Sequence, residues 1–348
     1  MSNASDAPVE GINTERVTAW LGERVPAMAE PLSFSLITGG HSNLTFTVTD
    51  GDQRRWVLRR PPLKQVLATA HDMGREHRIL SALQPTDVPV PPLVGLCTDD
   101  SVTGAPFYVM DHVDGRVVRN INDARELSLE ERATAGRSII DVLARIHAVD
   151  IDAAGLADFA KREDYIARQL RRWNGQFEKS KTRDLPVMDE VFDLLQAAIP
   201  MQGTAAVVHG DYRLDNCMLG HDGSVIAVLD WEICTLGDPL ADVGLLVVYW
   251  GDADGPMPHG AAAPTAAEGF PKKDDLLEAY AAASGRDLDG IEFYVAFGFW
   301  KLACIVEGVY ARYVGGAMGQ RDTSSFDFFG EQVVALADAA RAALGHHA

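Results

Sequence analysis

The sequence predicts an α+β protein of two lobes: a small antiparallel β lobe with one helix, then a larger and mainly helical lobe. Three observations indicate this division. Short runs of alternating apolar and polar residues occupy residues 32–113, and longer runs with apolar residues at helical spacing follow Asp114-Gly115. The length of 348 residues corresponds to about two domains. We therefore expect the first lobe, preceded by a short N-terminal helix, over residues 1–113, and the second over residues 114–348.

Four strands and one helix make up the expected first lobe. Met73, His77 and Leu80 recur at helical spacing and predict a helix over residues 71–83. The Asp50-Gly51 pair between the second and third strands is a strong signal for a tight hairpin turn. The expected strands are LSFSLI at 32–37, LTFTVTD at 44–50, RRWVLRR at 54–60 and PFYVMDHV at 106–113.

Long helices dominate the expected second lobe. Ser128 and Glu131 form a capping box, which begins a helix whose apolar side chains share one face. A compact strand-rich insert follows, with a turn at His221-Asp222-Gly223, and a Gly-, Pro- and Ala-rich loop is expected over residues 252–271. The insert's strands are AVVHG at 206–210, CMLG at 217–220 and SVIAVLD at 224–230. Further helices are expected near residues 189–199, 274–284, 291–314 and 330–344.

The composition is that of an ordinary folded protein, with 47% hydrophobic and 23% charged residues. The 31 Lys and Arg residues against 50 Asp and Glu give a formal net charge of −19, which disfavours binding to nucleic acid. An acidic surface would suit a cationic substrate, but solubility alone is the more common reason for such a charge. The oligomeric state is not encoded in these numbers.

Two further features bear on the compartment. The N-terminus shows no secretory signal, and the most apolar long run, residues 291–314, carries charges that we expect to make it too polar for a membrane span. These charges are Glu292, Lys301, Glu307 and Arg312. We therefore expect a cytoplasmic protein with no membrane partner. The cysteines are scattered without zinc-like spacing, which indicates reduced and mostly buried residues at positions 97, 217, 234 and 304.

The densest chemical signal is VVHGDYRLDNCML at residues 207–219, followed by VIAVLDWE at 225–232. Both segments place oxygen-bearing side chains at loop edges beside short strands. Phosphoryl transfer needs such a set, because a carboxylate must orient and deprotonate the attacking hydroxyl while hard oxygen ligands hold magnesium. Asp211 is then the candidate base, and Asn216 and Asp230 are the candidate metal ligands. The alternative is that these side chains only satisfy loop amides, as Asp and Asn often do.

At these motifs the chain resembles the aminoglycoside/choline phosphotransferases, which share the fold of the eukaryotic protein kinases. The HGDxxxxN loop and the LDWE segment match that family's catalytic and metal-binding motifs, and the resemblance covers roughly residues 33–315. It implies a protein-kinase-like bilobal fold, ATP or GTP and Mg²⁺ as cofactors, and a small-molecule hydroxyl as the phosphate acceptor.

The resemblance also implies which residues of the first lobe bind nucleotide. The segment at 38–43 would let Gly40, Ser42 and Asn43 approach the phosphate oxygens. Such kinases carry a Lys on the third strand that pairs with a Glu on the helix. Here Arg59 occupies that position and Glu76 is its expected partner, whereas Arg60 points to the opposite face of the strand.

The same resemblance places the adenine-binding segment at the end of the last strand of the lobe. There the main-chain groups of Asp111 and Val113 are expected to be free of sheet pairing. An ordinary edge strand is the alternative.

Several residues around the catalytic loop have roles that the sequence leaves more open. Arg213 is a candidate to steady the transferring phosphate, and His209 is expected to hold the loop through its ring nitrogens. Asp238 and Asp242, in a GDPxxD element, are expected to brace the loop and cap a helix. One face of the helix from residue 291 either lines the acceptor pocket or belongs to the core; it carries Trp300, Cys304, Glu307 and Ala311.

Three functions remain to be compared. The first is an ATP-dependent kinase that phosphorylates a small-molecule hydroxyl. The VLRRPP strand and the GGxSNxTF loop most resemble the kinase-like domains associated with acyl-CoA dehydrogenases. This resemblance implies a hydroxyacyl-type acceptor rather than an aminoglycoside. The second is a non-catalytic nucleotide-binding module, because Arg59 replaces the usual Lys. The third, a metallophosphoesterase, is disfavoured because GDYRLDN lacks that class's spacing and its histidine motifs.

Overall fold

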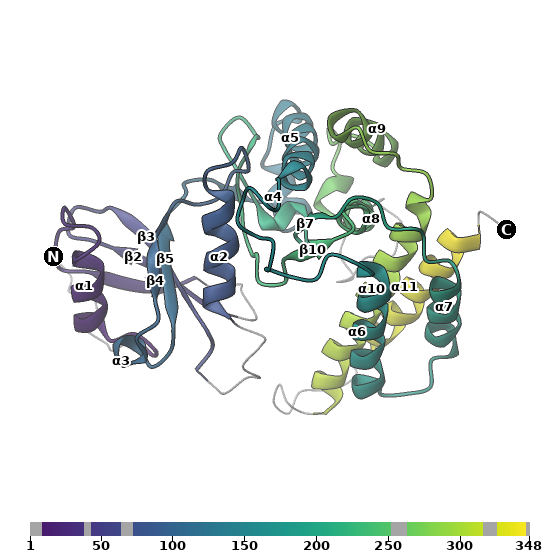
Figure 1. Cartoon of the computed structure of the whole chain (residues 1–348), viewed down its shortest axis with the longest axis horizontal. Helices are drawn as coiled ribbons and strands as arrows, with labels where there is room; N and C mark the ends of the chain where they lie inside the picture. Colours follow the sequence, from purple (N-terminus) through teal and green to yellow (C-terminus); the bar gives the residue numbers. More distant parts are fainter. Residues whose placement is uncertain (1–8, 38–42, 64–71, 252–262, 316–325, 346–348) are drawn as a thin grey trace. The chain divides into compact units, whose positions relative to one another are not determined.

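The computed structural model describes residues 9–37, 43–63, 72–251, 263–315 and 326–345. The chain forms two compact units (Figure 1). The first contains residues 1–114 and 227–232, and the second contains residues 115–226 and 233–348. The segment 227–232, which the sequence analysis assigned to the second lobe, therefore belongs to the first unit. This segment begins within strand β9 (Val225–Val228) and carries Asp230 and Glu232, whose carboxylates bind the side chain of Arg59.

An antiparallel sheet of five strands, in the order β1-β2-β3-β5-β4, forms the centre of the first unit. The tight turn at Asp50-Gly51 joins β2 to β3 as predicted, since Asp50 accepts the amides of Asp52 and Arg54. The strands are β1 (Ser33–Leu36), β2 (Leu44–Thr49), β3 (Arg55–Arg60), β4 (Leu93–Cys97) and β5 (Phe107–Asp111). Of these, β4 was not among the expected strands.

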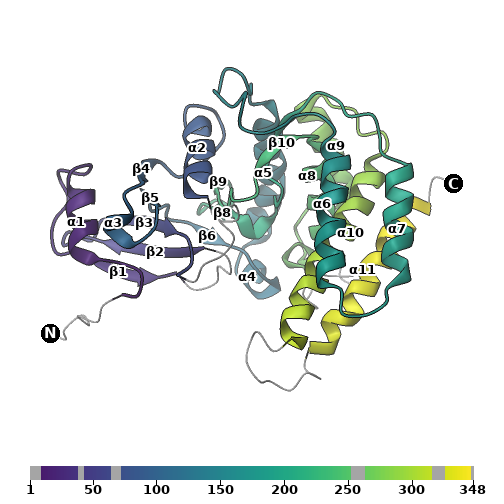
Figure 2. The ribbon, with the colours of Figure 1, turned by 60° about the horizontal axis from the view of Figure 1, so that its bottom comes forward.

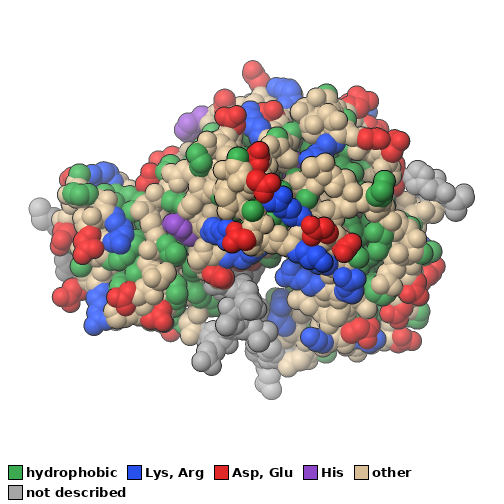
Figure 3. Space-filling view, viewed as in Figure 1, with side chains coloured by type: hydrophobic (Ala, Val, Ile, Leu, Met, Phe, Trp, Pro, Cys, Tyr) green, Lys and Arg blue, Asp and Glu red, His purple; other side chains and the backbone are tan. Residues whose placement is uncertain are grey.

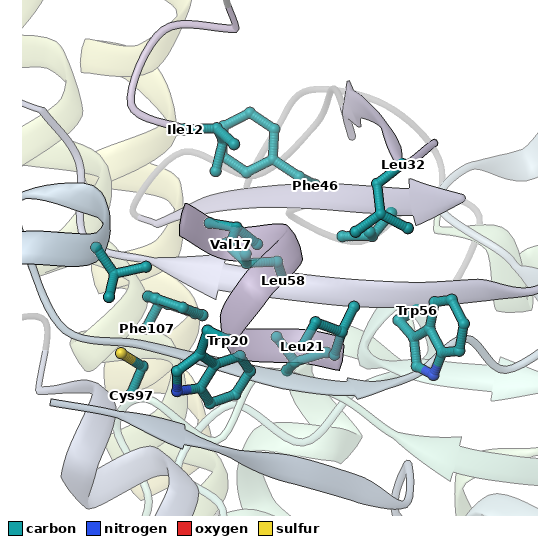
Figure 4. Close-up of a cluster of buried hydrophobic side chains, with 13 residues drawn as sticks. Ile12, Val17, Trp20, Leu21, Leu32, Phe46, Trp56, Leu58, Cys97 and Phe107 are labelled. Carbon is teal, nitrogen blue, oxygen red and sulfur yellow. The ribbon is translucent and has the colours of Figure 1, made fainter. Parts of the chain in front are cut away.

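One face of this sheet is covered by α1 (Thr14–Gly22) and the short α3 (Asp100–Thr103). Figure 4 shows the apolar cluster between helix and sheet, in which Trp20 and Leu21 of α1 meet Leu58 and Phe107 of the strands. Trp20 and Phe107 lie edge to face with ring centroids 5.0 Å apart. Burying aromatic and aliphatic side chains on this face stabilises the lobe.

The opposite face of the sheet carries α2 (Met73–Leu83), which begins at the N-cap Asp72. Side chains of successive strand residues alternate between faces. Arg59 therefore points to the α2 face, whereas Arg60 points to the α1 face, where it donates to the carbonyl oxygen of Thr103 at 2.9 Å. The predicted separation of Arg59 and Arg60 is confirmed.

The second unit is mainly helical, as Figure 2 shows. The capping box of Ser128 and Glu131 begins α5 as predicted. The apolar helix α10 packs against α6, α7, α8 and α11 and forms the centre of this unit. The helices are α4 (Ile121–Arg125), α5 (Leu129–Ala148), α6 (Tyr165–Ser180), α7 (Pro186–Ala197), α8 (Leu240–Tyr249), α9 (Lys273–Ser284), α10 (Ile291–Val314) and α11 (Asp327–Gly345). Of these, α4, α6 and α8 were not predicted from the sequence.

Short strands frame the candidate catalytic loop. In the second unit, β7 (Ala206–Val208) pairs with β10 (Thr235–Gly237), and β6 (Arg116–Val117) pairs with β8 (Cys217–Leu219). Residues 209–213 and the 3₁₀ turn η1 (Leu214–Asn216) connect β7 to β8. The chain then turns at Gly223, where φ is +85°, and enters β9 (Val225–Val228). The strand-rich insert is confirmed.

Helix α10 differs from one expectation. By length and composition it is apolar enough to cross a membrane, so the prediction that its charges make it too polar was wrong by this criterion. However, 67% of its apolar window is buried inside the structure, and the central helix of a protein core meets the same criterion.

Some of the remaining predictions concern residues that the structure does not describe. Of the loop expected over 252–271, the structure describes residues 263–271, which include the 3₁₀ turn η2 (Pro264–Ala266). The four cysteines are free and buried, as predicted. Figure 3 shows acidic side chains spread over the visible face rather than gathered in one patch, which agrees with a charge that serves solubility.

Candidate active site

Two groups of predicted site residues can be described, one in each unit. Arg59, Glu76 and Asp230 belong to the first unit, and Asp211 and Asn216 belong to the second. Their geometry is therefore given group by group. Gly40 and Ser42 lie outside the described residues.

Arg59 is the centre of the first group. Its Nε lies 3.1 Å from both carboxylate oxygens of Glu76, which confirms the predicted ion pair. Its Nη2 donates to Asp230 Oδ1 at 2.6 Å and to Glu232 Oε2 at 3.4 Å. The planar fork of arginine allows this arrangement, because its donors point in different fixed directions. One guanidinium thus connects three carboxylates from α2 and from the segment after β9.

Glu232 was missed by the sequence analysis. Its Oε2 also accepts a hydrogen bond of 3.0 Å from Nδ2 of Asn43, one of the predicted phosphate-binding residues. Asn43 is buried, so its amide group is fixed by this contact rather than free in solvent. The LDWE motif supplied a signal for Glu232, but its acidic side chain could equally have been a solvated surface residue.

Burial changes the ionisation of this group. Desolvation raises the pKa of Glu76 to about 7, although the Arg59 guanidinium opposes that rise. For Arg59, desolvation lowers the pKa, but the charges of Glu76, Tyr108 and Asp230 outweigh it and raise the pKa overall. Arg59 therefore stays cationic, and one positive charge stands against three acidic side chains. The net negative charge of this cluster favours the binding of a further cation nearby.

Asp230 has an uncommon backbone conformation. Its φ is +63°, in the left-handed region that non-glycine residues seldom adopt. The ion pair with Arg59 uses Oδ1, and the side chain is 35% exposed. Within the described part of the chain, Oδ2 has no hydrogen-bond partner, so one carboxylate oxygen is left to bind a ligand.

The expected adenine-binding segment requires one correction. The amide of Asp111 is not free of sheet pairing, because it donates to the Pro92 carbonyl at 2.8 Å. The reciprocal bond of this antiparallel pair would come from the amide of residue 92, which proline lacks. The Asp111 carbonyl thus receives no such bond from β4. Among the described residues, the Val113 amide also has no hydrogen-bond partner. An acceptor and a donor two residues apart stay available.

The second group is the loop between β7 and β8. Asn216 Nδ2 donates to the Asp211 carbonyl at 2.8 Å and to Asp211 Oδ2 at 3.0 Å. Both of these oxygens can only accept, so the amide nitrogen must face Asp211 and the Asn216 side-chain oxygen must face away from it. This orientation fixes the candidate base and leaves one hard oxygen on Asn216 for a metal.

Buried polar side chains brace this loop from behind. Asp242 of α8 accepts the amides of His209 at 2.7 Å and Gly210 at 2.8 Å. His209 Nδ1 accepts the Asp211 amide at 3.2 Å. Asp238 accepts the hydroxyl of Tyr294 at 2.7 Å. The predicted bracing of the loop by His209 and Asp242 is confirmed. Asp238 instead contacts α10 and accepts the amide of Leu240, the first residue of α8, at 3.1 Å.

Arg213 lies beside the candidate base. Its Nε is 3.3 Å from Asp211 Oδ2 and 3.0 Å from Asp215 Oδ1, and its guanidinium carbon lies 4.7 Å from the centroid of the Tyr249 ring. Two carboxylates and an aromatic face thus hold this cation in one place. Whether it contacts a transferring phosphate stays a prediction.

The residues fit a magnesium ion in their chemistry. Asn216 and Asp230 each offer one oxygen that the rest of the described chain does not use, and Mg²⁺ binds through few protein oxygens while keeping water and phosphate ligands. Among the described residues, no group of three or more His, Cys, Asp or Glu side chains could hold a metal alone.

The helix face that the sequence left open belongs largely to the core. Trp300 is fully buried, stacks on Phe192 and donates to the Met188 carbonyl at 3.2 Å. Glu307 is fully buried and accepts from the Thr182 hydroxyl at 2.8 Å and from Arg183 at 2.9 Å. These contacts connect α10 to α7 and to the segment between α6 and α7.

Known proteins share both the motifs and the fold. The model of the phosphotransferase enzyme family matches residues 33–294. Acyl-CoA dehydrogenase family member 10 of Mus musculus is 36% identical over 290 residues, which make up 82% of this chain and 27% of that relative. The chain therefore spans about a quarter of the length of that protein.

Solved structures of this family are also similar to the chain. A Ralstonia eutropha protein, provisionally assigned as an aminoglycoside phosphotransferase, is 34% identical with a TM-score of 0.81, covering 96% of this chain and 98% of that chain. The ternary complex of APH(2")-IIa with streptomycin and ATP is 15% identical with a TM-score of 0.56, covering 88% of this chain and 91% of that one. At this identity the likeness concerns the fold alone. The protein-kinase-like α+β fold predicted from the sequence is confirmed.

Proposed function

The chain belongs to the phosphotransferase enzyme family, and on this premise we propose that it transfers the γ-phosphate of ATP to a hydroxyl group of a small molecule. The observation that supports this most directly is the pairing of Asp211 with Asn216. Asn216 holds the carboxylate of Asp211 by a bond of 3.0 Å and keeps its own oxygen for a metal. The same amide also donates to the Asp211 carbonyl at 2.8 Å, so one side chain both braces the loop and orients the carboxylate.

In the proposed reaction Asp211 accepts the proton of the acceptor hydroxyl. The hydroxyl oxygen bonds to the γ-phosphorus as the bond from that phosphorus to the β–γ bridging oxygen breaks, and ADP leaves. Asn216 and Asp230 would hold Mg²⁺, which neutralises phosphate charge when it is bound. Arg59, fixed by Glu76, would orient the phosphates, and Asn43 would be held by Glu232 for the same purpose.

For the acceptor we propose a hydroxylated acyl-type metabolite. The support is the 36% identity to an acyl-CoA dehydrogenase family member, because a kinase-like segment joined to such an enzyme is expected to act on related molecules. An aminoglycoside is the alternative, supported by the provisional assignment of the Ralstonia eutropha protein and by the acidic composition.

A non-catalytic nucleotide-binding module is the second candidate function. It is suggested by arginine at position 59, where the kinases of this fold carry lysine. The contacts of Arg59 argue against it, because the ion pair to the helix is kept and the side chain also reaches Asp230. Asp211, Asn216 and Asp230 are likewise all present.

The test is a screen of acceptors with purified protein and Mg²⁺-ATP or Mg²⁺-GTP, read as release of ADP or GDP. Hydroxyacyl compounds, simple hydroxy acids and aminoglycosides are compared at equal concentration, with Asp211→Ala as the blank. Turnover with one hydroxyl-bearing class, absent from the blank, supports the proposal. Nucleotide binding without release of diphosphate for any acceptor would support the module instead.

A further inference from the structure

Lys301 of α10 is a buried cation beside the catalytic loop. Its side chain is 7% exposed, and its Nζ donates to the carbonyl oxygen of Gly210 at 2.6 Å. Burial lowers the pKa of Lys301, while the carboxylates of Asp211 and Asp242 oppose that change. The desolvation cost of an ammonium group is large, so a buried lysine needs favourable contacts that offset this cost.

The bond from Lys301 acts on one particular peptide. The Gly210 carbonyl belongs to the peptide group that joins Gly210 to Asp211, the candidate base. Gly210 donates its own amide to Asp242 Oδ1 at 2.8 Å. An acidic residue on α8 therefore holds the amide of this glycine, and a basic residue on α10 holds its carbonyl.

Gly210 needs to be held, because its backbone is otherwise free to rotate. Its φ is +85°, where glycine pays no steric penalty, and a Cβ built there would lie 3.2 Å from Ile233. Glycine adopts many conformations with similar energy, so this residue alone would not specify the direction in which Asp211 leaves it. The two charged contacts supply that specification.

A third contact fixes the lysine itself. Its Nζ lies 5.4 Å from the centroid of the Trp173 ring on α6, within the range of a cation–π interaction. The ammonium is thus placed between an aromatic face and a carbonyl oxygen. A methionine would fill the same apolar space without a desolvation cost, so packing alone does not explain a lysine here.

We propose that Lys301 is a positioning residue, which sets the orientation of the Gly210–Asp211 peptide and thereby the place of the Asp211 carboxylate. This proposal rests on the proposed role of Asp211 as the base. Nothing in the sequence motifs marks Lys301, since it lies 91 residues beyond Gly210 and outside the HGDxxxxN loop.

The test compares Lys301→Met with Leu302→Ala. Leu302 is the next residue on α10 and is also buried, so it controls for loss of packing. We expect Lys301→Met to lower kcat by about 10- to 100-fold with little change in KM for Mg²⁺-ATP. A misplaced catalytic group stabilises the transition state less, whereas substrate binding is affected little. Leu302→Ala should lower thermal stability without a selective fall in kcat.

A chemical rescue distinguishes a positioning role from a purely structural one, because a side chain that only fills space would not be replaced specifically by a cation. Lys301→Ala removes the side chain and leaves space for a small amine. Added ethylammonium should restore at least part of kcat to Lys301→Ala, whereas propanol of similar size should not. Equal rescue by both compounds, or loss of kcat in Leu302→Ala as large as in Lys301→Met, would overturn the proposal.

Hydrogen exchange separates this proposal from the proposed function. In Lys301→Met, amides of residues 209–213 should exchange about 10-fold faster than in the wild type, and in Leu302→Ala they should exchange no faster than the rest of the unit. This result is obtained even if no acceptor is turned over. Unchanged protection of the loop in Lys301→Met would reject the positioning role, whatever the enzyme assays show.

Discussion

A single residue, Arg59, departs most clearly from the pattern of related kinases, and its contacts explain the departure. A lysine has one small charged group and could satisfy Glu76 or Asp230, but its ammonium cannot present separate, fixed donors to both. Arg59 directs Nε to Glu76 and Nη2 to Asp230 and Glu232. Here arginine preserves the strand-to-helix ion pair and adds a second connection.

Arg59→Lys should therefore weaken nucleotide binding even though the charge is kept. We expect the Kd of Mg²⁺-ATP, measured by titration calorimetry, to rise by about 10-fold, corresponding to the loss of one charge-assisted hydrogen bond. Arg59→Met should raise it further. If Arg59→Lys bound nucleotide as well as the wild type, the fork geometry would have no role in binding.

Asp211 is the residue whose loss should separate chemistry from binding. Asp211→Ala is expected to lower kcat by about 10²- to 10⁴-fold, the range for removing a general base, with a nearly unchanged Kd for nucleotide. Asp215→Ala is the matched control, because Asp215 contacts Arg213 in the same way. An equal fall in kcat for both variants would mean that Asp211 acts only through Arg213.

Glu76 makes the stability of the nucleotide-free protein depend on pH. Its pKa is about 7 in the folded state against 4.5 for an ordinary glutamate. Between these values the folded protein keeps a proton that the unfolded chain releases, so stability falls as pH rises from 4.5 to 7. Relative to Glu76→Gln, which cannot titrate, the wild type should lose about 3 kcal/mol of unfolding free energy over this window. Urea denaturation at several pH values measures the difference, and parallel curves would contradict it.

At the scale of elements, close packing of α8 against α10 depends on glycine. A Cβ built at Gly244 of α8 would lie 2.4 Å from the carbonyl carbon of Tyr294 on α10, which is closer than atoms can approach. Gly298 of α10 has Val248 and Leu245 of α8 as its nearest neighbours. The helix that carries Asp242 and the helix that carries Lys301 are thus in near backbone contact.

Gly244→Ala should force these helices apart. We expect it to lower the free energy of unfolding by about 1–3 kcal/mol, as overpacking does in other cores. Gly175→Ala in α6 is the control, since a Cβ there would meet nothing within 4 Å. That variant should be more stable than the wild type by about 0.5–1 kcal/mol, because alanine favours a helix. Thermal melts of both variants give the comparison, and a neutral Gly244→Ala would show that the helices can adjust.

The elements that could be predicted from the sequence are those with strong local signals. The alternation in residues 44–60 and the capping box at Ser128 leave few alternatives, and both predictions were confirmed. Strand β4 was missed because Gly95 interrupts it and prolines precede it. Helix α8 is apolar on all sides, so its residues show no helical period. Helix α6 begins without a capping side chain.

In the candidate site, too, only residues within local sequence motifs could be predicted. Asp211, Asn216 and Asp230 stand in motifs of recognisable spacing, and Glu76 lies at a predictable place on its helix. Glu232 and Lys301 could not be assigned roles, because their partners are far away in sequence: Asn43 is 189 residues before Glu232 and Gly210 is 91 residues before Lys301. Contacts of this kind are specified by the packing of whole elements, which no local pattern records.

For the whole molecule, the proposed function assigns Asn216 and Asp230 to the binding of magnesium. Asn216 in the second unit and Asp230 in the first each keep a single unused oxygen. Neither can hold the ion alone, because hard cations need several oxygen ligands and these residues offer only one each.

A double-mutant cycle tests this assignment. Asn216→Ala and Asp230→Ala should each weaken Mg²⁺-ATP binding, and the double variant should lose less than the sum of the two, with an interaction energy of about 0.5–3 kcal/mol. Excess EDTA should abolish the interaction energy, since the ion is then removed, while Asp230→Ala keeps any effect that it exerts through Arg59. The control cycle replaces Asn216→Ala by Asp222→Ala, in the turn before β9, and should be additive. Strict additivity of Asn216→Ala and Asp230→Ala would mean that the two oxygens do not share an ion, and the proposed catalytic arrangement would then be wrong.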